Sequence, residues 1–191
     1  MIISHNSPRS NYFDLSQQLF SNYGPQQLLK FSTRMKDRDV PIATAQTQYS
    51  LMTAEASKDA LSACDEVGCR LISYSPLCLG LLTGKYSIEN NILPPQGPRR
   101  QLFKELLPGA KSLLQTLEAI AVDREKTMSQ VAINWCIAKG GVPIPGAKTL
   151  SQAQENLGAV GWKLSLDEVE ELTRASSMVS KPMIQNVFQT K

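Results

Sequence analysis

The sequence predicts an α/β fold in which parallel strands alternate with helices. From residue 19 onward, short apolar segments of strand character alternate with longer segments of helical periodicity. Each predicted strand also ends in a turn that carries polar, aromatic or proline residues. Such alternation implies right-handed crossovers between parallel strands. Ligand sites in parallel α/β sheets lie at the carboxyl ends of the strands, so these turns are the first places to search for function.

The first strand and helix are predicted at the start of the alternating region. Residues 19–21 form a short strand, and Asn22 is placed to cap the helix that follows, with Pro25 tolerated in its first turn. That helix extends to about Arg38, and residues 42–45 form the second strand.

The middle of the chain contains one more helix and strand, followed by a long irregular segment. Residues 54–67 are predicted as a helix that ends at Gly68, and residues 70–74 as a strand. Residues 76–109 contain five prolines and four glycines, which indicates a long loop. A loop of this length is typical of a functional segment.

The last third is predicted to be mainly helical, with one strand. Thr127 is expected to cap one of its helices, and Ser165 and Glu168 form a capping box for the last one. The predicted elements are helices at 111–124, from 127 to Gly140, at 149–158 and from 165 onward, and a strand at 142–145.

Length and composition are those of a globular domain with one sizeable core. The 191 residues are 42% hydrophobic and 19% charged, and the net charge is +3. No basic stripe with interleaved aromatic residues is present, which argues against nucleic acid as a partner. No apolar segment approaches the length of a membrane span.

The cysteine and histidine content restricts the possible chemistry. Cys64, Cys69, Cys78 and Cys136 lie in apolar stretches without Cys-x-x-Cys spacing, so we expect reduced core residues. The single histidine is His5, which argues against a histidine-based metal site or a serine–histidine triad in the body of the domain. No metal ligands are predicted.

The chain divides into a leader, one domain and a tail. Residues 1–18 are rich in Ser, Asn and Gln and lack periodicity, so they are predicted to be an unstructured leader. The domain covers 19–178 and the tail 179–191. The leader has no apolar core of a signal peptide and is a weak match to a transit peptide. The expected compartment is the cytoplasm, with the chloroplast as the alternative.

The third predicted strand ends in residues suited to a planar ring with attached phosphates. Tyr74 is placed to stack on a ring, or it is a core tyrosine with a satisfied hydroxyl. Ser75 and the amides after Pro76 are placed to hold a pyrophosphate, although Ser-Pro is also common in turns. Lys85 offers a positive charge, or is simply solvated.

The fourth predicted strand ends in a similar way. Gly146 and Lys148 precede a helix whose N-terminal end favours an anion. Gln152, Glu155 and Asn156 share one helical face, which suits either a purine edge or solvent. Arg99, in the long loop, is a further candidate for an adenine or a phosphate, or is simply a surface residue. Neither the G-x-G-x-x-G nor the Walker motif is present.

Taken in order, these segments resemble the aldo-keto reductase family, and the match to its plant members is close. The channel-associated beta-subunit branch is also similar. The resemblance covers about residues 19–175, and the ordered set is far more specific than any one motif. The residues that carry it are Ser21-Asn22-Tyr23-Gly24, Gln46 to Ser50, Ser73 to Leu77, Gly84-Lys85-Tyr86 and Ile144-Pro145-Gly146 with Gln152, Glu155 and Asn156.

The resemblance implies an eight-stranded α/β barrel that binds NADP(H) and reduces a small-molecule carbonyl to an alcohol. It assigns the nicotinamide carboxamide to Ser21, Asn22 and Gln46, and the nicotinamide ring to Tyr74. It assigns the pyrophosphate to Ser75, Pro76, Leu77 and Lys85. It assigns the adenosine end to Arg99, Lys148, Gln152, Glu155 and Asn156, with Lys148 or Arg99 near the 2′-phosphate, and Gly146 is a further cofactor-binding residue.

The same resemblance implies that this chain corresponds to the second half of the barrel. The family's catalytic tyrosine, lysine, aspartate and histidine belong to the first half, and none of Tyr12, Tyr23, Tyr49, Tyr74 and Tyr86 matches the catalytic tyrosine. We therefore assign no catalytic residues and expect no activity from this chain alone. The alternatives are a half barrel that binds NADP(H) or a protein partner without catalysis, and a fragment that does not fold. A half barrel leaves parallel edges open, which favours self-association.

Overall fold

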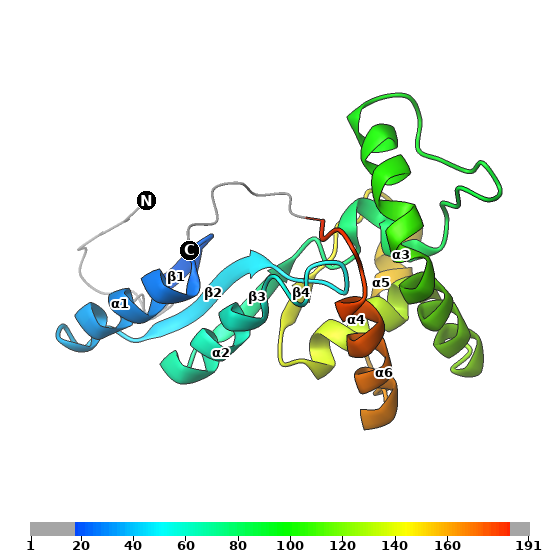
Figure 1. Cartoon of the computed structure of the whole chain (residues 1–191). Coiled ribbons are helices and arrows are strands. Elements are labelled where there is room, and N and C mark those ends of the chain that lie inside the picture. Colours follow the sequence, from blue (N-terminus) through cyan, green and yellow to red (C-terminus); the bar gives the residue numbers. More distant parts are fainter. Residues whose placement is uncertain (1–17, 184–191) are drawn as a thin grey trace.

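The computed structural model describes residues 18–183, and its centre is a sheet of four parallel strands (Figure 1). The strands are β1 (Gln18–Ser21), β2 (Ile42–Gln48), β3 (Arg70–Tyr74) and β4 (Val142–Ile144). They lie in the sheet in the order of the sequence, and each neighbouring pair is parallel. The predicted α/β class and the four parallel strands are therefore confirmed.

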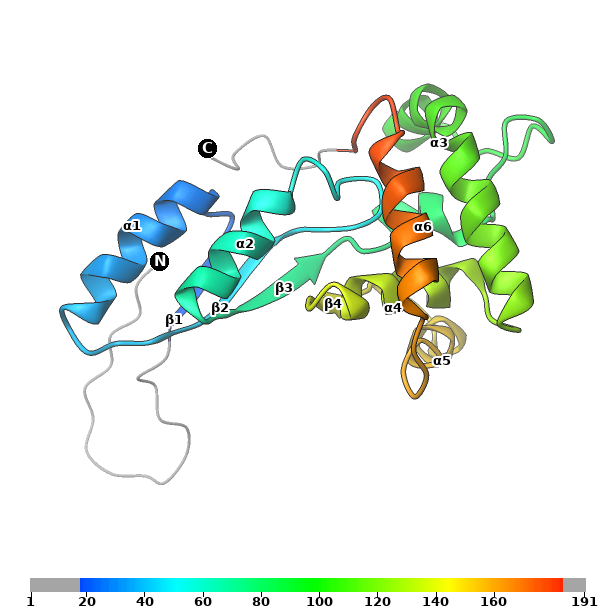
Figure 2. The same ribbon diagram turned by 60° about the horizontal axis from the view of Figure 1, so that its bottom comes forward.

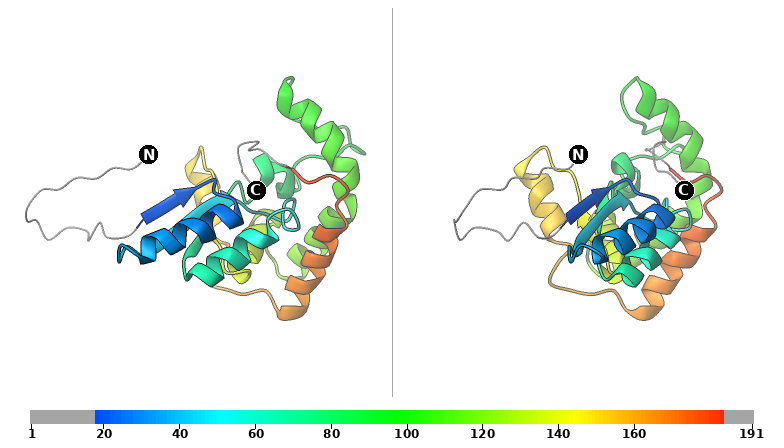
Figure 3. Two further views of the ribbon diagram at one scale, coloured as in Figure 1. Left: turned by 60° about the vertical axis from the view of Figure 1, so that its left-hand side comes forward. Right: turned by 90° about the vertical axis from the view of Figure 1, so that its left-hand side faces the viewer.

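One face of this sheet is covered by helices and contributes to the core. Phe20, Ala45 and Leu71 lie side by side in the strand register, and all three are buried. The ring of Phe20 packs against Phe31 of α1 (Pro25–Lys36), with 4.7 Å between ring centroids. Helix α2 (Lys58–Val67) contacts α1 and lies along the same side of the strands (Figure 3).

The remaining helices form a second layer beyond β3 and β4. Helices α3 (Pro98–Asp123), α4 (Met128–Ala138) and α6 (Leu166–Ser177) contact one another (Figure 2), and α5 (Leu150–Leu157) packs against α4. Their facing surfaces carry large, fully buried side chains, including Phe103, Leu113, Leu117, Trp135 and Leu172. These side chains pack between the helices, and they belong to the same buried cluster as Phe20, Ala45 and Leu71 of the sheet.

Several predicted boundaries are confirmed because local chemistry determines them. Strand β3 has the predicted limits. Gly68 ends α2 with a left-handed φ of 77°, which glycine adopts without steric cost. Thr127 and Ser165 each form a complete capping box at the start of α4 and α6, with Gln130 and Glu168 as the third residues.

Other boundaries differ from the predictions. The first helix begins at Pro25 with Gly24 as its N-cap, so Asn22 is not the cap that we predicted. Strand β2 continues to Gln48, three residues beyond the predicted Ala45, because pairing with β3 extends along that length. Helix α2 begins at Lys58 rather than at residue 54, since turns occupy residues 51–57.

The largest difference concerns residues 76–109, which we predicted as one loop. They include a 3₁₀ helix, η1 (Cys78–Thr83), and the first turns of α3, which begins at Pro98 rather than near residue 111. Proline at the first helical position is favourable, and buried Phe103, Leu106 and Leu107 hold these turns against the core. Pro108 lies inside the helix, although it is one of the five prolines of the predicted loop.

The predicted tail begins with residues that pack on the domain. The Met183 side chain is buried, its N–H donates to the Met52 carbonyl at 3.2 Å, and its carbonyl accepts from Gln48 Nε2 at 2.6 Å. The predicted leader, apart from Gln18, and the tail beyond Met183 lie outside the described residues, as does His5. No helix within residues 18–183 is long and apolar enough to cross a membrane.

Candidate functional site

A groove of about 870 Å³ lies at the carboxyl ends of β3 and β4. Its walls come from the turn after each of these strands, from the 3₁₀ helix η1, and from α5 and the start of α3. Eleven of the fourteen residues predicted to bind a cofactor line it: Tyr74, Ser75, Pro76, Leu77, Lys85, Arg99, Gly146, Lys148, Gln152, Glu155 and Asn156. The structure thus gathers segments more than 70 residues apart in the sequence around one groove.

The other three predicted residues form a cluster beside the groove. Ser21 and Gln46 are register partners on β1 and β2, and the Asn22 N–H donates to the Gln46 carbonyl at 2.9 Å. The Tyr74 hydroxyl donates to Asn22 Oδ1 at 3.0 Å. Because Tyr74 also lines the groove, it connects this cluster to the other eleven residues.

The backbone after β3 takes conformations that residues other than glycine rarely adopt. Ser75, Cys78 and Leu79 have φ values of 52°, 50° and 55°, in the left-handed region. Leu79 is 45% exposed and, with Ser75, lines the groove. Such conformations cost on the order of 1–3 kcal/mol each, and they are concentrated at ligand sites. This strain supports a binding role for the turn.

Arg99 is held over two aromatic rings at the groove wall. Its guanidinium carbon lies 5.1 Å from the centre of the Tyr86 ring and 5.2 Å from that of Phe103, and Nη2 donates to the Tyr86 hydroxyl at 3.1 Å. A Cβ atom at Gly80 would approach Arg99 Nη2 to 3.1 Å, so a glycine at this position lets the guanidinium lie against η1. Its Nε is buried and has no hydrogen-bond partner within the described part of the chain.

The turn after β4 is held in place by side chains of α5. The Lys148 N–H donates to Gln152 Oε1 at 2.7 Å, and Asn156 Nδ2 donates to the Gly146 carbonyl at 3.4 Å. Thr149 caps the helix by accepting from the Gln152 N–H at 3.2 Å. The amide side chains that we predicted to meet a purine edge therefore also fix the shape of the turn.

The charges on the groove walls favour an anionic ligand. Among the described residues, Lys85, Arg99 and Lys148 are its cations and Glu155 is its only carboxylate. Glu155 Oε1 accepts from the Thr127 hydroxyl at 3.1 Å. None of the three cations takes part in an ion pair within residues 18–183. A concave surface with excess positive charge concentrates anions such as phosphates.

The groove also includes residues that the sequence did not identify. Tyr86 and Thr83 lie beside Lys85, and Ser129 comes from the first turn of α4. Tyr86 is the most consequential of them, because it holds Arg99. It belongs to the Gly84-Lys85-Tyr86 motif, so the sequence held a signal for it. Ser129 is separated from the nearest groove motif by more than ten residues and carries no such signal.

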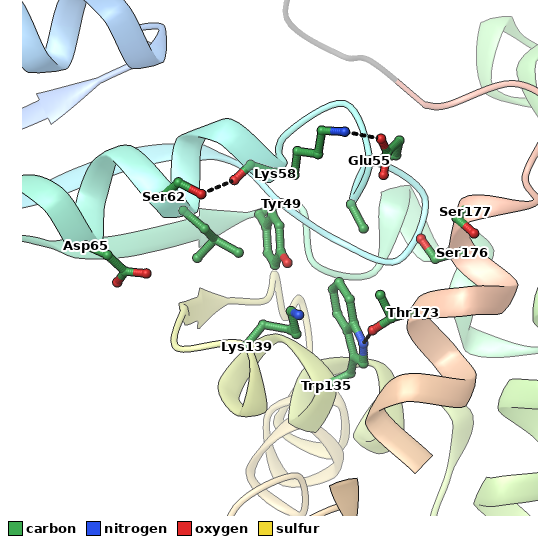
Figure 4. A pocket seen from close by; sticks show the side chains of 12 residues that line it. Tyr49, Glu55, Lys58, Ser62, Asp65, Trp135, Lys139, Thr173, Ser176 and Ser177 are labelled. Atoms are coloured by element: carbon green, nitrogen blue, oxygen red, sulfur yellow. Dashed lines mark hydrogen bonds and ion pairs between the residues drawn. The ribbon is translucent and has the colours of Figure 1, made fainter. Parts of the chain in front are cut away.

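A second, smaller cavity of about 330 Å³ lies between α2, α4 and α6 (Figure 4). The rings of Tyr49 and Trp135 are stacked there at 5.3 Å, and Trp135 Nε1 donates to Thr173 Oγ1 at 3.1 Å. Burial raises the pKa of the Tyr49 hydroxyl. Glu55 and Lys58 pair with each other at 2.5 Å, and the two other charged residues of the lining, Asp65 and Lys139, are opposite in sign, so this cavity has no excess charge to attract a ligand. We therefore consider the larger groove to be the functional site.

No metal centre is indicated by the described residues. Within 18–183, no three side chains of His, Cys, Asp or Glu are gathered closely enough to hold a metal ion. All four cysteines are free and buried, which confirms the prediction of reduced core residues.

Comparison with known proteins gives one consistent result. The profile of the Aldo/keto reductase family matches residues 19–177. Pyridoxal reductase, chloroplastic, from Arabidopsis thaliana is 54% identical over 172 residues, which are 90% of this chain and 46% of the relative. An aldo-keto reductase from Schizosaccharomyces pombe, whose name specifies NADP(+), is 32% identical over 146 residues, which are 71% of this chain and 42% of the relative.

Solved structures support the same conclusion. A thermostable aldo-keto reductase, crystallised with the inhibitor epalrestat, superposes with a TM-score of 0.60 at 27% identity. The match covers 81% of this chain and 46% of that one. The chain thus spans about half the length of the relatives that it matches. Its four strands and surrounding helices correspond to part of the family's barrel. The chain therefore belongs to the aldo/keto reductase family, as its sequence predicted.

Proposed function

We propose that this chain is the NADP(H)-binding half of an aldo-keto-reductase-type oxidoreductase. One observation carries the proposal. The groove, which the Tyr74 ring also lines, gathers three cations and a buried Arg99 Nε that have no ion-pair or hydrogen-bond partner, respectively, within residues 18–183. A dinucleotide with three phosphates supplies the negative charge, and its planar rings suit Tyr74 and the Arg99 guanidinium. The donor set therefore fits the cofactor.

The proposed residue roles follow the line of the groove. Ser21, Asn22 and Gln46 hold the nicotinamide carboxamide, and the Tyr74 ring stacks on the nicotinamide. Ser75, Pro76, Leu77 and Lys85 surround the pyrophosphate. The adenosine end lies against Arg99, Gly146, Lys148, Gln152, Glu155 and Asn156. When bound, the cofactor supplies the hydride that converts a carbonyl into an alcohol.

The proton that must accompany the hydride has no identified donor in this chain. A donor has to lie within hydrogen-bond reach of the substrate oxygen, with a pKa suited to the transfer. None of the five tyrosines matches the family's catalytic tyrosine. We therefore propose that these 191 residues bind the cofactor and reduce no carbonyl by themselves. The second candidate, a half barrel that acts only by binding, is favoured by the outer edges of β1 and β4, which pair with no other strand within residues 18–183.

The substrate and compartment are proposed by analogy. The Arabidopsis relative is named a pyridoxal reductase, so pyridoxal is the first aldehyde to test with any assembly that completes the barrel. Its name also places that relative in the chloroplast, which supports our alternative compartment over the cytoplasm that we first expected.

Fluorescence titration with NADPH tests the binding proposal, with two neighbouring arginines as a matched pair. Arg99→Met removes the groove guanidinium, and we expect affinity to fall at least about tenfold, because a hydrogen bond to a charged group contributes about 1.5–3 kcal/mol. Arg100→Met removes a side chain that lines no part of the groove and donates to the Pro94 carbonyl at 2.9 Å. It should leave the affinity within about twofold. Equal losses in the two variants would contradict the assignment.

An activity assay tests the second part of the proposal. Purified chain, NADPH and pyridoxal are mixed, and NADPH consumption is followed by absorbance. We expect no rate above that of a sample without protein. A clear rate, lost in Arg99→Met and retained in Arg100→Met, would show that the chain contains its own proton donor.

A further inference from the structure

The face of the sheet opposite α1 and α2, here called the inner face, is covered by no helix within residues 18–183, although Gln48 at the end of β2 is buried and donates to the Met183 carbonyl. On the inner face, Ser21, Gln46, Ile72 and Val142 form one row across all four strands in the strand register. All four side chains are exposed or partly exposed, whereas Phe20, Ala45 and Leu71 behind them are buried. No described helix covers the row.

The most exposed apolar side chains of the sheet lie on its two edge strands. Leu19 on β1 is 57% exposed, and Val142 and Ile144 on β4 are 48% and 46% exposed. Within residues 18–183, the outer edges of β1 and β4 pair with no other strand. Neither strand carries a charged residue, the usual device that protects an edge from pairing. Pro143 has no N–H to donate, so a partner at the edge of β4 would be held mainly by the apolar side chains of Val142 and Ile144.

The arrangement of the strands specifies a geometry for the partner. The four strands are parallel and follow the order of the sequence. A half-turn about an axis along the strands therefore places β4 of one copy beside β1 of another, parallel, at both seams. The pair has eight parallel strands, the number that closes an α/β barrel. Since one copy spans about 46% of a complete relative, two copies also match its size.

We propose that the inner face and its two edges form a docking surface for a second copy of this chain. The two copies make a closed, two-fold symmetric barrel in which each seam joins β4 of one copy to β1 of the other. The symmetric pair buries both edges and both inner faces at once. Arg70, at the first residue of β3, is exposed at the amino end of the strands, so its charge remains near solvent.

Light scattering coupled to size-exclusion chromatography tests this proposal over a range of micromolar concentrations. The expected mass is twice the 21.0 kDa of one chain. Leu19→Lys and Val142→Glu each place a charge at both seams and should shift the protein to monomer. Val122→Glu is the control, since Val122 is 71% exposed on α3, away from the sheet. Circular dichroism confirms that each variant keeps its helices.

Mixing the two edge variants gives the sharpest result. In a mixed pair, one seam contains both charges, which are opposite, and the other seam is unaltered. We expect Leu19→Lys and Val142→Glu to be monomers separately and to regain the dimer mass together. A monomeric wild-type chain, or edge variants that keep the dimer mass, would overturn the proposal. So would an open polymer, or a monomer that pairs only with the separately produced first half of the Arabidopsis reductase.

Discussion

The Tyr74 hydroxyl donates a hydrogen bond to the Asn22 side-chain carbonyl, with 3.0 Å between the oxygens. The bond joins the end of β3 to the residue after β1, across the intervening strand β2. It fixes the Tyr74 ring beside the groove and makes the two groups of predicted site residues continuous. Asn22 itself has a φ of 61°, a left-handed conformation that asparagine tolerates better than most residues.

Removal of this hydrogen bond should destabilise the fold measurably. Tyr74→Phe is expected to lower the free energy of unfolding by about 0.5–1.5 kcal/mol, the usual net value of one hydrogen bond. Urea unfolding measures the change. Asn22→Gly removes the acceptor and keeps the positive φ accessible, so a double-mutant cycle isolates the pair. Strict additivity of the two changes would show that the bond contributes nothing.

Gly141, the residue before β4, lies close to β3, so a larger residue at this position should destabilise the fold. A Cβ at Gly141 would lie 2.5 Å from Ser73 Oγ and 3.2 Å from the Cys136 carbonyl oxygen. Gly141→Ala should therefore reduce stability by about 1–3 kcal/mol, as overpacking does in other cores. Gly146→Ala is the matched control, because no atom lies within 4 Å of its added Cβ. Similar urea midpoints for the two variants would rule out the predicted clash.

The Ser73 hydroxyl offers a companion test. Ser73 Oγ is buried and has no hydrogen-bond partner within the described residues. Ser73→Ala should be neutral or stabilising, because it removes an unpaired buried polar group. It should also lessen the penalty of Gly141→Ala in the double variant. A marked loss of stability in Ser73→Ala alone would show that the hydroxyl has a partner.

The ion pair between Arg124, the C-cap of α3, and Glu168 of α6 should make the stability of the fold sensitive to acid. Arg124 donates hydrogen bonds from Nε and Nη2 to the Glu168 carboxylate, at 2.6 and 2.5 Å. These bonds are the main reason why the pKa of Glu168 is lowered to about 2. A glutamate in the unfolded chain titrates near pH 4.3, so protonation favours the unfolded state. This contribution should be complete above about pH 5 and be lost as the pH falls toward 2. The midpoint of thermal unfolding, measured from pH 7 to pH 3, reports the loss.

Two glutamates of α6 separate this effect from general acid denaturation. Glu168→Gln should be less stable than wild type at pH 7 and converge with it at low pH. Glu170→Gln, at an exposed position on the same helix, should follow the wild-type curve throughout. A constant difference between Glu168→Gln and wild type across the range would exclude titration of Glu168 as the cause.

The four buried cysteines should be unreactive in the native protein. Burial is the main reason why the pKa of the Cys78 thiol is raised to about 12. It also raises the pKa of Cys64, Cys69 and Cys136. Since the thiolate is the reactive form, a disulfide reagent such as Ellman's should modify them only after unfolding. Leu166→Cys, at a site that is 83% exposed, should react at once and serves as the positive control. Rapid native modification of the wild type would contradict the burial of these thiols.

The sequence was sufficient where local chemistry decides the structure. Gly68, Thr127 and Ser165 mark helix ends through turn and capping preferences, and β3 is a continuous β-prone segment. The start of α3 was missed because Pro98 and Pro108 were interpreted as loop residues. Only the burial of Phe103 and Leu106 in the tertiary structure shows that the helix begins so early.

The sequence predicted which residues belong to the candidate site, but not which residues hold them in place. The strand ends identified Tyr74 and Lys148, because parallel strands place their carboxyl ends together. That Tyr86 holds Arg99, and that Gly80 leaves it room, depends on distances between segments that the sequence leaves open. For the same reason, the sequence did not show that Gln152 and Asn156 hydrogen-bond to the backbone of the turn after β4.

Calorimetric titration of the purified chain with NADP(+) and, separately, with NAD(+) tests the central claim most directly. If the groove holds the phosphorylated cofactor, NADP(+) binds at one site per chain and more tightly than NAD(+). The preference shrinks in Lys148→Ala, which removes a groove cation without an ion-pair partner within residues 18–183. The same change at Lys111, which pairs with Glu89 outside the groove, should leave the preference intact. The absence of a binding heat for both nucleotides from a chain that unfolds cooperatively would contradict the account.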